Sequence, residues 1–129
     1  MPDSNDVLGS IRTALGVMQD PVIVTSAALD PPGPAIVYVN DAFCRVSGYD
    51  RDEVLGKTPR ILQGPSTCPD TLRRLRHDLN SKQSFFGDVI NRRKDGSEFA
   101  VKCQIVPLHD DDGTVRHWLN IQRDVTDLN

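Results

Sequence analysis

The last third of the chain, where two tight turns separate three strand-like segments, constrains the fold most. Residues 84–92, 98–108 and 115–123 read as strands, and Asp95-Gly96 and Asp112-Gly113 stand between them. Asp-Gly between such segments is a strong signal for a hairpin turn. The sequence therefore predicts an antiparallel three-stranded meander in this part of the chain.

A second hairpin is predicted near the start of the chain. Residues 21–25 and 35–39 are β-branched runs, and the breaker-rich segment 30–34 separates them. These two strands add to the three of the meander.

Short helices are predicted between the two groups of strands. Asn40 or Asp41 can cap one, Asp50 can cap another, and Pro69 is well placed to start a longer helix over residues 70–79. This order of elements predicts an α+β fold, with short helices on one face of a five-stranded antiparallel sheet.

The N-terminal segment predicts an amphipathic helix over residues 6–19. Its apolar residues recur at spacings of three and four: Leu8, Ile11, Leu15 and Met18. We therefore divide the chain into an N-terminal amphipathic helix or cap, residues 1–19, and a domain over residues 20–127.

One face of the predicted sheet carries an apolar stripe that needs a cover. The stripe consists of Phe86, Ile90, Val106, Leu108, Leu119 and Ile121. The helix over residues 6–19 and a second copy of the domain are the two candidate covers, so a homodimer is expected.

Composition argues against several classes of function. A net charge of -3 over 129 residues, with scattered Lys and Arg, argues against nucleic-acid binding. No apolar run approaches the roughly 20 residues of a membrane span, so we expect a cytoplasmic protein. Cys44, Cys68 and Cys103 have no metal-ligand spacing, which fits reduced thiols. No catalytic cluster stands out, so no enzyme is expected.

The opposite face of the sheet carries polar side chains among apolar ones. Side chains two apart share a face, so Asn91 lies with Val89 and Phe85, and Gln122 lies with Trp118 and Asn120. A structural bond to the backbone is the ordinary role of one buried amide. A heterocycle with amide-like edges is the alternative that would satisfy both.

The segment Gly56-Lys57-Thr58-Pro59-Arg60-Ile61-Leu62-Gln63-Gly64 carries the resemblance to a known family. It resembles the Gly-x-Asn-Cys-Arg-Phe-Leu-Gln-Gly signature of the light-oxygen-voltage (LOV) branch of the PAS superfamily. Residues 123–127 also resemble the tag that ends many PAS domains before an output linker. The resemblance implies a PAS fold and a LOV-like sensory domain over residues 20–127.

The resemblance implies a bound flavin, with FMN expected first and FAD second. Asn91, Gln122 and Gln63 match the amides that contact the flavin ring, and Arg60 and Arg76 match the arginines that hold its phosphate. The cofactor-binding residues implied in this way are Thr25, Thr58, Arg60, Leu62, Gln63, Arg76, Asn91, Val101, Cys103 and Gln122.

Three positions depart from the family pattern. Pro59 stands where the family has its photoactive cysteine, so no cysteinyl-flavin adduct can form there. Thr58 and Val101 replace family asparagines, which removes amide contacts. Of the three cysteines, Cys103 is the one on the predicted inner face. The ordinary role of a cysteine there is that of a small buried apolar residue.

The resemblance predicts signalling of blue-light or redox state through flavin reduction. Gln122 can rotate its amide to match a changed flavin and pass the change to the C-terminal connector and an unknown output domain. One alternative is a ligand-free PAS module for dimerisation. The other is a haem-binding PAS sensor with His77 as the iron ligand.

Overall fold

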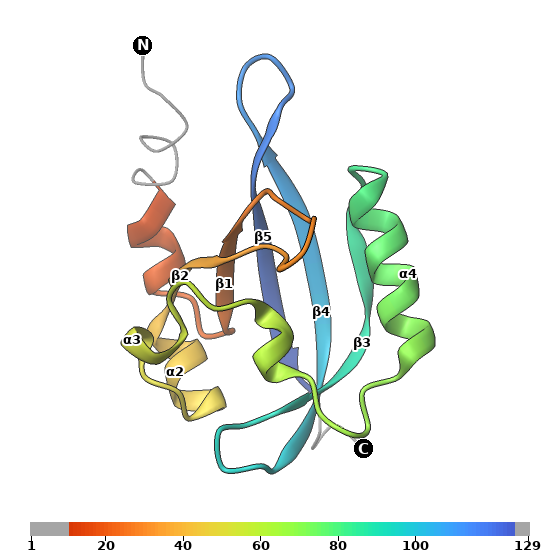
Figure 1. Cartoon of the computed structure of the whole chain (residues 1–129). Helices are drawn as coiled ribbons and strands as arrows, with labels where there is room; N and C mark the ends of the chain where they lie inside the picture. The colour runs from red at the N-terminus through yellow and green to blue at the C-terminus, as the bar shows by residue number, and fades with distance from the viewer. Residues whose placement is uncertain (1–10, 126–129) are drawn as a thin grey trace.

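An antiparallel sheet with strand order β2-β1-β5-β4-β3 forms the body of the protein (Figure 1). The computed structural model describes residues 11–125. The five strands are β1 (Val22–Ser26), β2 (Ile36–Val39), β3 (Phe85–Arg92), β4 (Glu98–His109) and β5 (Val115–Asp124). The predicted meander and hairpin are confirmed, and β1 pairs with β5 to join them into one sheet.

Four short helices lie between β2 and β3 and pack on one face of the sheet (Figure 1). They are α2 (Asp41–Ser47), α3 (Arg51–Val54), the 3-10 helix η1 (Pro59–Leu62) and α4 (Pro69–Asn80). The caps predicted from sequence act as expected, because the Asn40 side chain accepts from Phe43 N and Pro69 starts α4. The α+β architecture is therefore confirmed.

The helix η1 is not predicted from sequence. Thr58 caps it by accepting from Arg60 N, and Pro59 occupies its first turn, where its missing N–H costs nothing. Four residues without a periodic apolar stripe give too weak a pattern to distinguish this turn from a loop.

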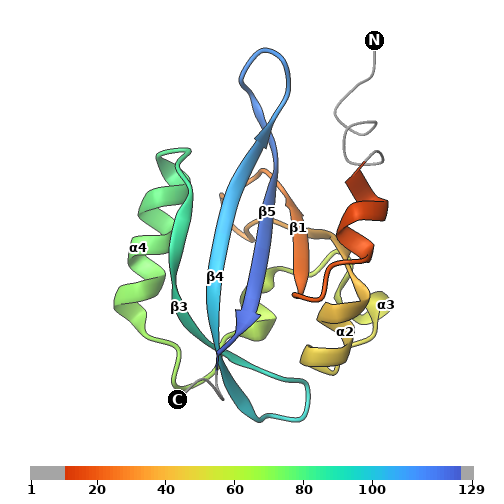
Figure 2. The same cartoon turned by 180° about the vertical axis from the view of Figure 1, so that it is seen from behind.

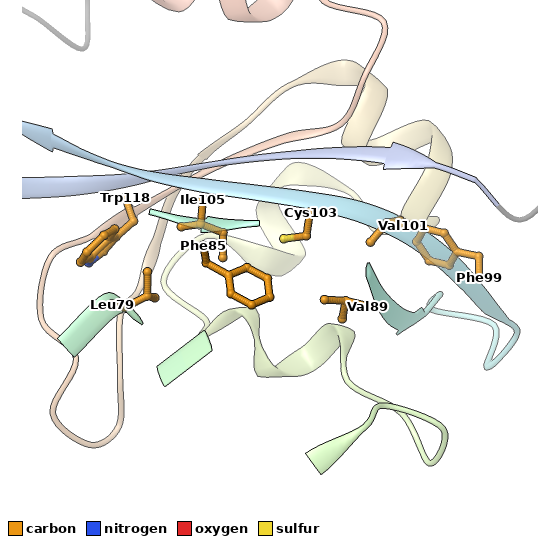
Figure 3. Close-up of a cluster of buried hydrophobic side chains, with 8 residues drawn as sticks. All are labelled: Leu79, Phe85, Val89, Phe99, Val101, Cys103, Ile105 and Trp118. Carbon is orange, nitrogen blue, oxygen red and sulfur yellow. The ribbon is translucent and has the colours of Figure 1, made fainter. Parts of the chain in front are cut away.

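The predicted alternation of the meander strands is confirmed. The inner face of the sheet presents buried side chains that point to the same side as α4 (Figure 3). They are Phe85, Val89, Phe99, Val101, Cys103, Ile105 and Trp118, and Leu79 of α4 packs against them. This layer positions the site described below.

The N-terminal helix ends earlier than predicted. Residues 11–16 are helical, whereas the prediction extended the helix to residue 19, and residues 6–10 lie outside the described part of the chain. The Leu15 carbonyl accepts from Met18 N and from Asn40 Nδ2, which closes the helix with a tight turn. Thr126 and Asp127 of the predicted connector also lie outside the described residues.

This helix covers only part of the outer face of the sheet (Figure 2). Leu15 is buried against Val22 and Val24 of β1, and Leu119 and Ile121 of β5 pack against the same cluster. Phe86 on β3 remains 58% exposed. Within residues 11–125, no helix is both long and apolar enough to cross a membrane.

Candidate functional site: a cavity between the sheet and the helices

A cavity of about 370 Å³ lies between the inner face of the sheet and the helices. This volume falls within the roughly 300–1,000 Å³ of typical small-molecule sites. Its floor comes from β3, β4 and β5, its walls from η1 and α4, and the loop between β1 and β2 contributes Leu29, Gly33 and Pro34. Its lining combines apolar side chains with polar ones, and polar groups in such a pocket fix the orientation of a ligand.

Nine of the ten residues implied as cofactor contacts line this cavity. They are Thr25, Thr58, Arg60, Leu62, Gln63, Arg76, Asn91, Cys103 and Gln122. The segments that carry them lie far apart in sequence and meet only in the folded chain. Val101 is fully buried but does not line the cavity.

The amides of Asn91 and Gln122 explain why Val101 does not line the cavity. Asn91 pairs with Phe99 and Gln122 pairs with Cys103 across β4, so Val101 lies between them on the same face. Asn91 Nδ2 donates to Gln122 Oε1 at 3.1 Å, and this bond spans β4 above Val101. The amide pair thus stands between Val101 and the cavity.

The three predicted amides retain unused hydrogen-bonding capacity. Asn91 Oδ1, Gln122 Nε2 and the side-chain amide of Gln63 have no hydrogen-bond partner among residues 11–125. A backbone bridge between Gln63 and Asn91 holds these two residues side by side. Donors and acceptors therefore face the same cavity from β3, from β5 and from the residue that follows η1.

Two arginines stand at the wall of the cavity without a partner. The guanidinium groups of Arg60 on η1 and Arg76 on α4 form no hydrogen bond or ion pair within the described part of the chain. Both residues are exposed, so their charges stay hydrated. Two guanidinium groups at the wall of one cavity suit a phosphate group.

Cys103 is a buried thiol beside the amide cluster. Its Sγ donates to Asn120 Oδ1 at 3.2 Å, and the residue is 5% exposed. Burial raises the pKa of the Cys103 thiol to about 12. A thiol in this state is a poor nucleophile, because the thiolate is the reactive form.

The structure gives no support to a metal centre in residues 11–125. His77, the ligand of the haem alternative, is exposed and does not line the cavity. No group of three or more His, Cys, Asp or Glu side chains within these residues could hold a metal ion.

Two parts of the cavity wall carry no role in the sequence analysis. Asn120 lines the cavity beside Gln122, and alternation had already placed it on this face. Gly33 and Pro34 line it from the β1–β2 loop, where a high density of prolines predicts a turn but not its direction.

Comparisons with known proteins give a consistent result. A family model described as PAS domain matches residues 20–127. Blue-light-activated histidine kinase 1 of Erythrobacter litoralis (strain HTCC2594) is 38% identical over 101 residues, which are 77% of this chain and 28% of that protein. The chain spans between 15% and 28% of the length of the first curated relatives it matches.

Solved structures agree in fold over most of the chain. One, described as "Flavin Analogue Sheds Light on Light-Oxygen-Voltage Domain Mechanism", has a TM-score of 0.80 and 31% identity and covers 95% of this chain and 86% of that one. The LOV domain of the Erythrobacter litoralis EL346 blue-light activated histidine kinase has a TM-score of 0.77 and 29% identity. That match covers 84% of this chain and 98% of the other.

Proposed function

The chain belongs to the PAS domain family and has the α+β fold of light-oxygen-voltage domains, and from this premise we propose that it is a flavin-binding sensory domain without an adduct-forming cysteine. In this proposal the domain senses a signal and catalyses no reaction. One observation carries it: the unused amide groups of Gln63, Asn91 and Gln122 converge on one cavity. A flavin ring offers the carbonyl, imine and N–H groups that would satisfy them.

FMN is the form that the arginines favour. Arg60 and Arg76 line the cavity with guanidinium groups that have no partner among residues 11–125 and that would hold a terminal phosphate. The Gly33-Pro34 segment lies in the cavity wall, so the adenine half of FAD would have to pass this loop. FAD remains the second candidate.

We propose that no cysteinyl adduct forms in this domain. Pro59 lines the cavity at the position of the family cysteine and has no nucleophile. Cys103 is the one thiol lining the cavity, and burial raises its pKa, which keeps it protonated.

Gln122 is the residue that we propose to read the state of the flavin. A bound flavin supplies blue-light absorption and reversible electron uptake. The Gln122 amide carries a donor and an acceptor, so a rotation exchanges its hydrogen bonds, including the one from Asn91. Gln122 lies two residues before the end of β5, so this change reaches the C-terminal end of the domain directly.

The absorption spectrum of the purified protein is the first test. We expect the structured blue band of oxidised flavin, with bleaching under illumination that requires an electron donor. Formation of a single near-ultraviolet band that disappears in Cys103→Ala would instead establish an adduct. A protein that stays colourless after incubation with FMN and FAD would support the ligand-free dimerisation module.

The role of Gln122 needs a separate comparison of matched variants. Gln122→Leu should bind flavin but lose the change in hydrogen exchange of β5 between oxidised and reduced protein. Gln83→Leu makes the same change at an exposed position between α4 and β3 and should respond as the wild type does. An unchanged response in Gln122→Leu would contradict the proposed signalling route.

We also propose that a second copy of the domain covers the outer face of β3 and β4. Phe86 is 58% exposed there, next to partly buried apolar residues of β3 and β4 such as Ile90 and Val106. Phe86→Asp should convert a dimer into a monomer in light scattering, whereas a monomeric wild type would remove this part of the proposal.

A further inference from the structure

Asn120 is a buried polar residue in the cavity wall that has no role in the function proposed above. It lies on the inner face of β5, is 9% exposed, and lines the cavity two residues before Gln122. An apolar or small residue would complete this wall at no desolvation cost. A buried amide is expensive unless hydrogen bonds satisfy it.

Only half of the Asn120 amide is satisfied by the protein. Its Oδ1 accepts from Cys103 Sγ at 3.2 Å. Its Nδ2 has no hydrogen-bond partner among residues 11–125. Every fully enclosed side-chain N or O atom in these residues has a partner, so Nδ2 is not fully enclosed. The free N–H groups of Asn120 therefore face the open space of the cavity.

Cys103 fixes the orientation of this amide. A protonated thiol donates a hydrogen bond but is a weak acceptor, so it selects the amide oxygen and turns the amide nitrogen away from itself. Burial raises the pKa of Cys103 to about 12, which keeps the proton on sulfur at physiological pH. The Cys103–Asn120 pair thus presents a donor to the cavity.

Gln122 presents a second donor on the same strand. Its Oε1 accepts from Asn91 Nδ2, which leaves Gln122 Nε2 without a partner in the described residues. Residues two apart on a strand are separated by about 7 Å. The wall formed by β5 therefore carries two amide N–H groups, while Asn91 Oδ1 supplies an acceptor from β3.

We propose that Asn120, oriented by Cys103, is a further ligand-contacting residue that donates a hydrogen bond to an acceptor atom of the planar heterocycle in the cavity. This inference rests on the proposed flavin-binding function and extends it. Asn120 contacts the ligand, and Cys103 is a positioning residue. The ligand edge that fits this wall carries two acceptors for β5 and one N–H for Asn91, as the carbonyl and ring-nitrogen edges of a flavin can provide.

The test is a titration of flavin-free protein with FMN and, separately, with riboflavin. Asn120→Leu keeps the number and branching of the side-chain heavy atoms and removes the donor, so its Kd for FMN should rise about ten-fold. Riboflavin binding should weaken by the same factor, because the contact is to the ring. Arg76→Gln should weaken FMN binding and leave riboflavin binding unchanged, which distinguishes ring contacts from phosphate contacts.

Cys103 is tested by rescue. Cys103→Ala removes the group that orients the amide and should raise the Kd by about three-fold, while Cys103→Ser keeps a donor and should restore the wild-type value. A role in packing alone predicts that both variants behave alike, and that result would overturn the positioning role.

Leu119→Ala is the control for stability, because Leu119 lies on β5 but packs on the outer face with Val22 and Val24. It should lower the melting temperature of the flavin-free protein and leave the Kd unchanged. An equal loss of affinity in Leu119→Ala and Asn120→Leu would show that stability explains the effect and would overturn the inference.

The remaining outcomes separate this inference from the function on which it rests. If wild type binds FMN and Asn120→Leu binds it equally well, the contact is refuted and the flavin site stands. If the wild type binds neither FMN nor riboflavin, the proposed function and this contact both fall.

Discussion

Replacing Asn40 with alanine should strongly destabilise the fold. Asn40 is fully buried at the N-cap of α2 and uses both ends of its amide. Its Oδ1 accepts from Val22 N at 2.9 Å and Phe43 N at 3.0 Å. Its Nδ2 donates to the carbonyls of Leu15 and Asp20, both at 3.0 Å. One side chain therefore joins the N-terminal helix, β1 and α2.

The magnitude follows from the groups that alanine leaves without a partner. Loss of the N-cap bond costs about 1 kcal/mol. The buried N–H of Val22 loses its partner, which costs roughly 1–3 kcal/mol, and the Asp20 carbonyl adds about 1 kcal/mol. The Leu15 carbonyl keeps the bond from Met18 N and adds little. The total is about 3–5 kcal/mol, or a fall in melting temperature of roughly 10–20 °C for a chain of this size.

Urea unfolding followed by tryptophan fluorescence measures this loss directly. Trp118 is the one tryptophan of the chain and is 3% exposed, so its emission reports the folded core. Asn40→Asp keeps the acceptors and loses the donors, so it should fall between alanine and wild type. Asn80→Ala, at an exposed position without a side-chain hydrogen bond in the described residues, should change stability by less than about 0.5 kcal/mol. A loss below about 1 kcal/mol in Asn40→Ala would refute the reasoning.

Three further predictions concern other sites. Iodoacetamide at neutral pH should label Cys68, because the hydrogen bond from the backbone of Thr71 lowers the pKa of this exposed thiol. Cys103 is buried and should stay unlabelled until the protein unfolds. Equal labelling rates of the two thiols in mass spectrometry would contradict this prediction. Thr67→Val should lower the free energy of unfolding in urea by about 2–3 kcal/mol, because Thr67 Oγ1 donates to the Ile90 carbonyl at 2.6 Å and accepts from Gly64 N. An unchanged free energy of unfolding would show that these two hydrogen bonds do not stabilise the fold. Burial lowers the pKa of His117, so its contribution to stability is present above the ordinary histidine pKa of about 6.5 and is lost as the pH falls through the lowered value. In His117→Gln, the urea midpoint should therefore fall less on acidification than it does in the wild type. An identical dependence of the midpoint on pH in both proteins would contradict this assignment.

Local sequence patterns determined the elements and the faces of the strands. The two Asp-Gly turns, the caps at Asn40 and Pro69 and the two-residue alternation of β3, β4 and β5 each depend on neighbours within a few residues. For this reason the inward positions of Asn91, Gln122 and Cys103 could be predicted before the fold was known. The N-terminal helix was predicted three residues too long, because its end depends on Asn40, 25 residues away from Leu15.

The site itself is a property of the tertiary structure. Asn91 and Gln122 are 31 residues apart, and only the order of the strands shows that they bond to each other above Val101. Asn120 has the same alternation as its neighbours, so nothing local distinguishes a satisfied amide from one that presents its N–H groups to a cavity. The sequence alone determined which side chains turn inward, because that choice follows from backbone geometry. Tertiary structure decided which of them meet and which keep free hydrogen-bonding groups, because those contacts join distant segments of the chain.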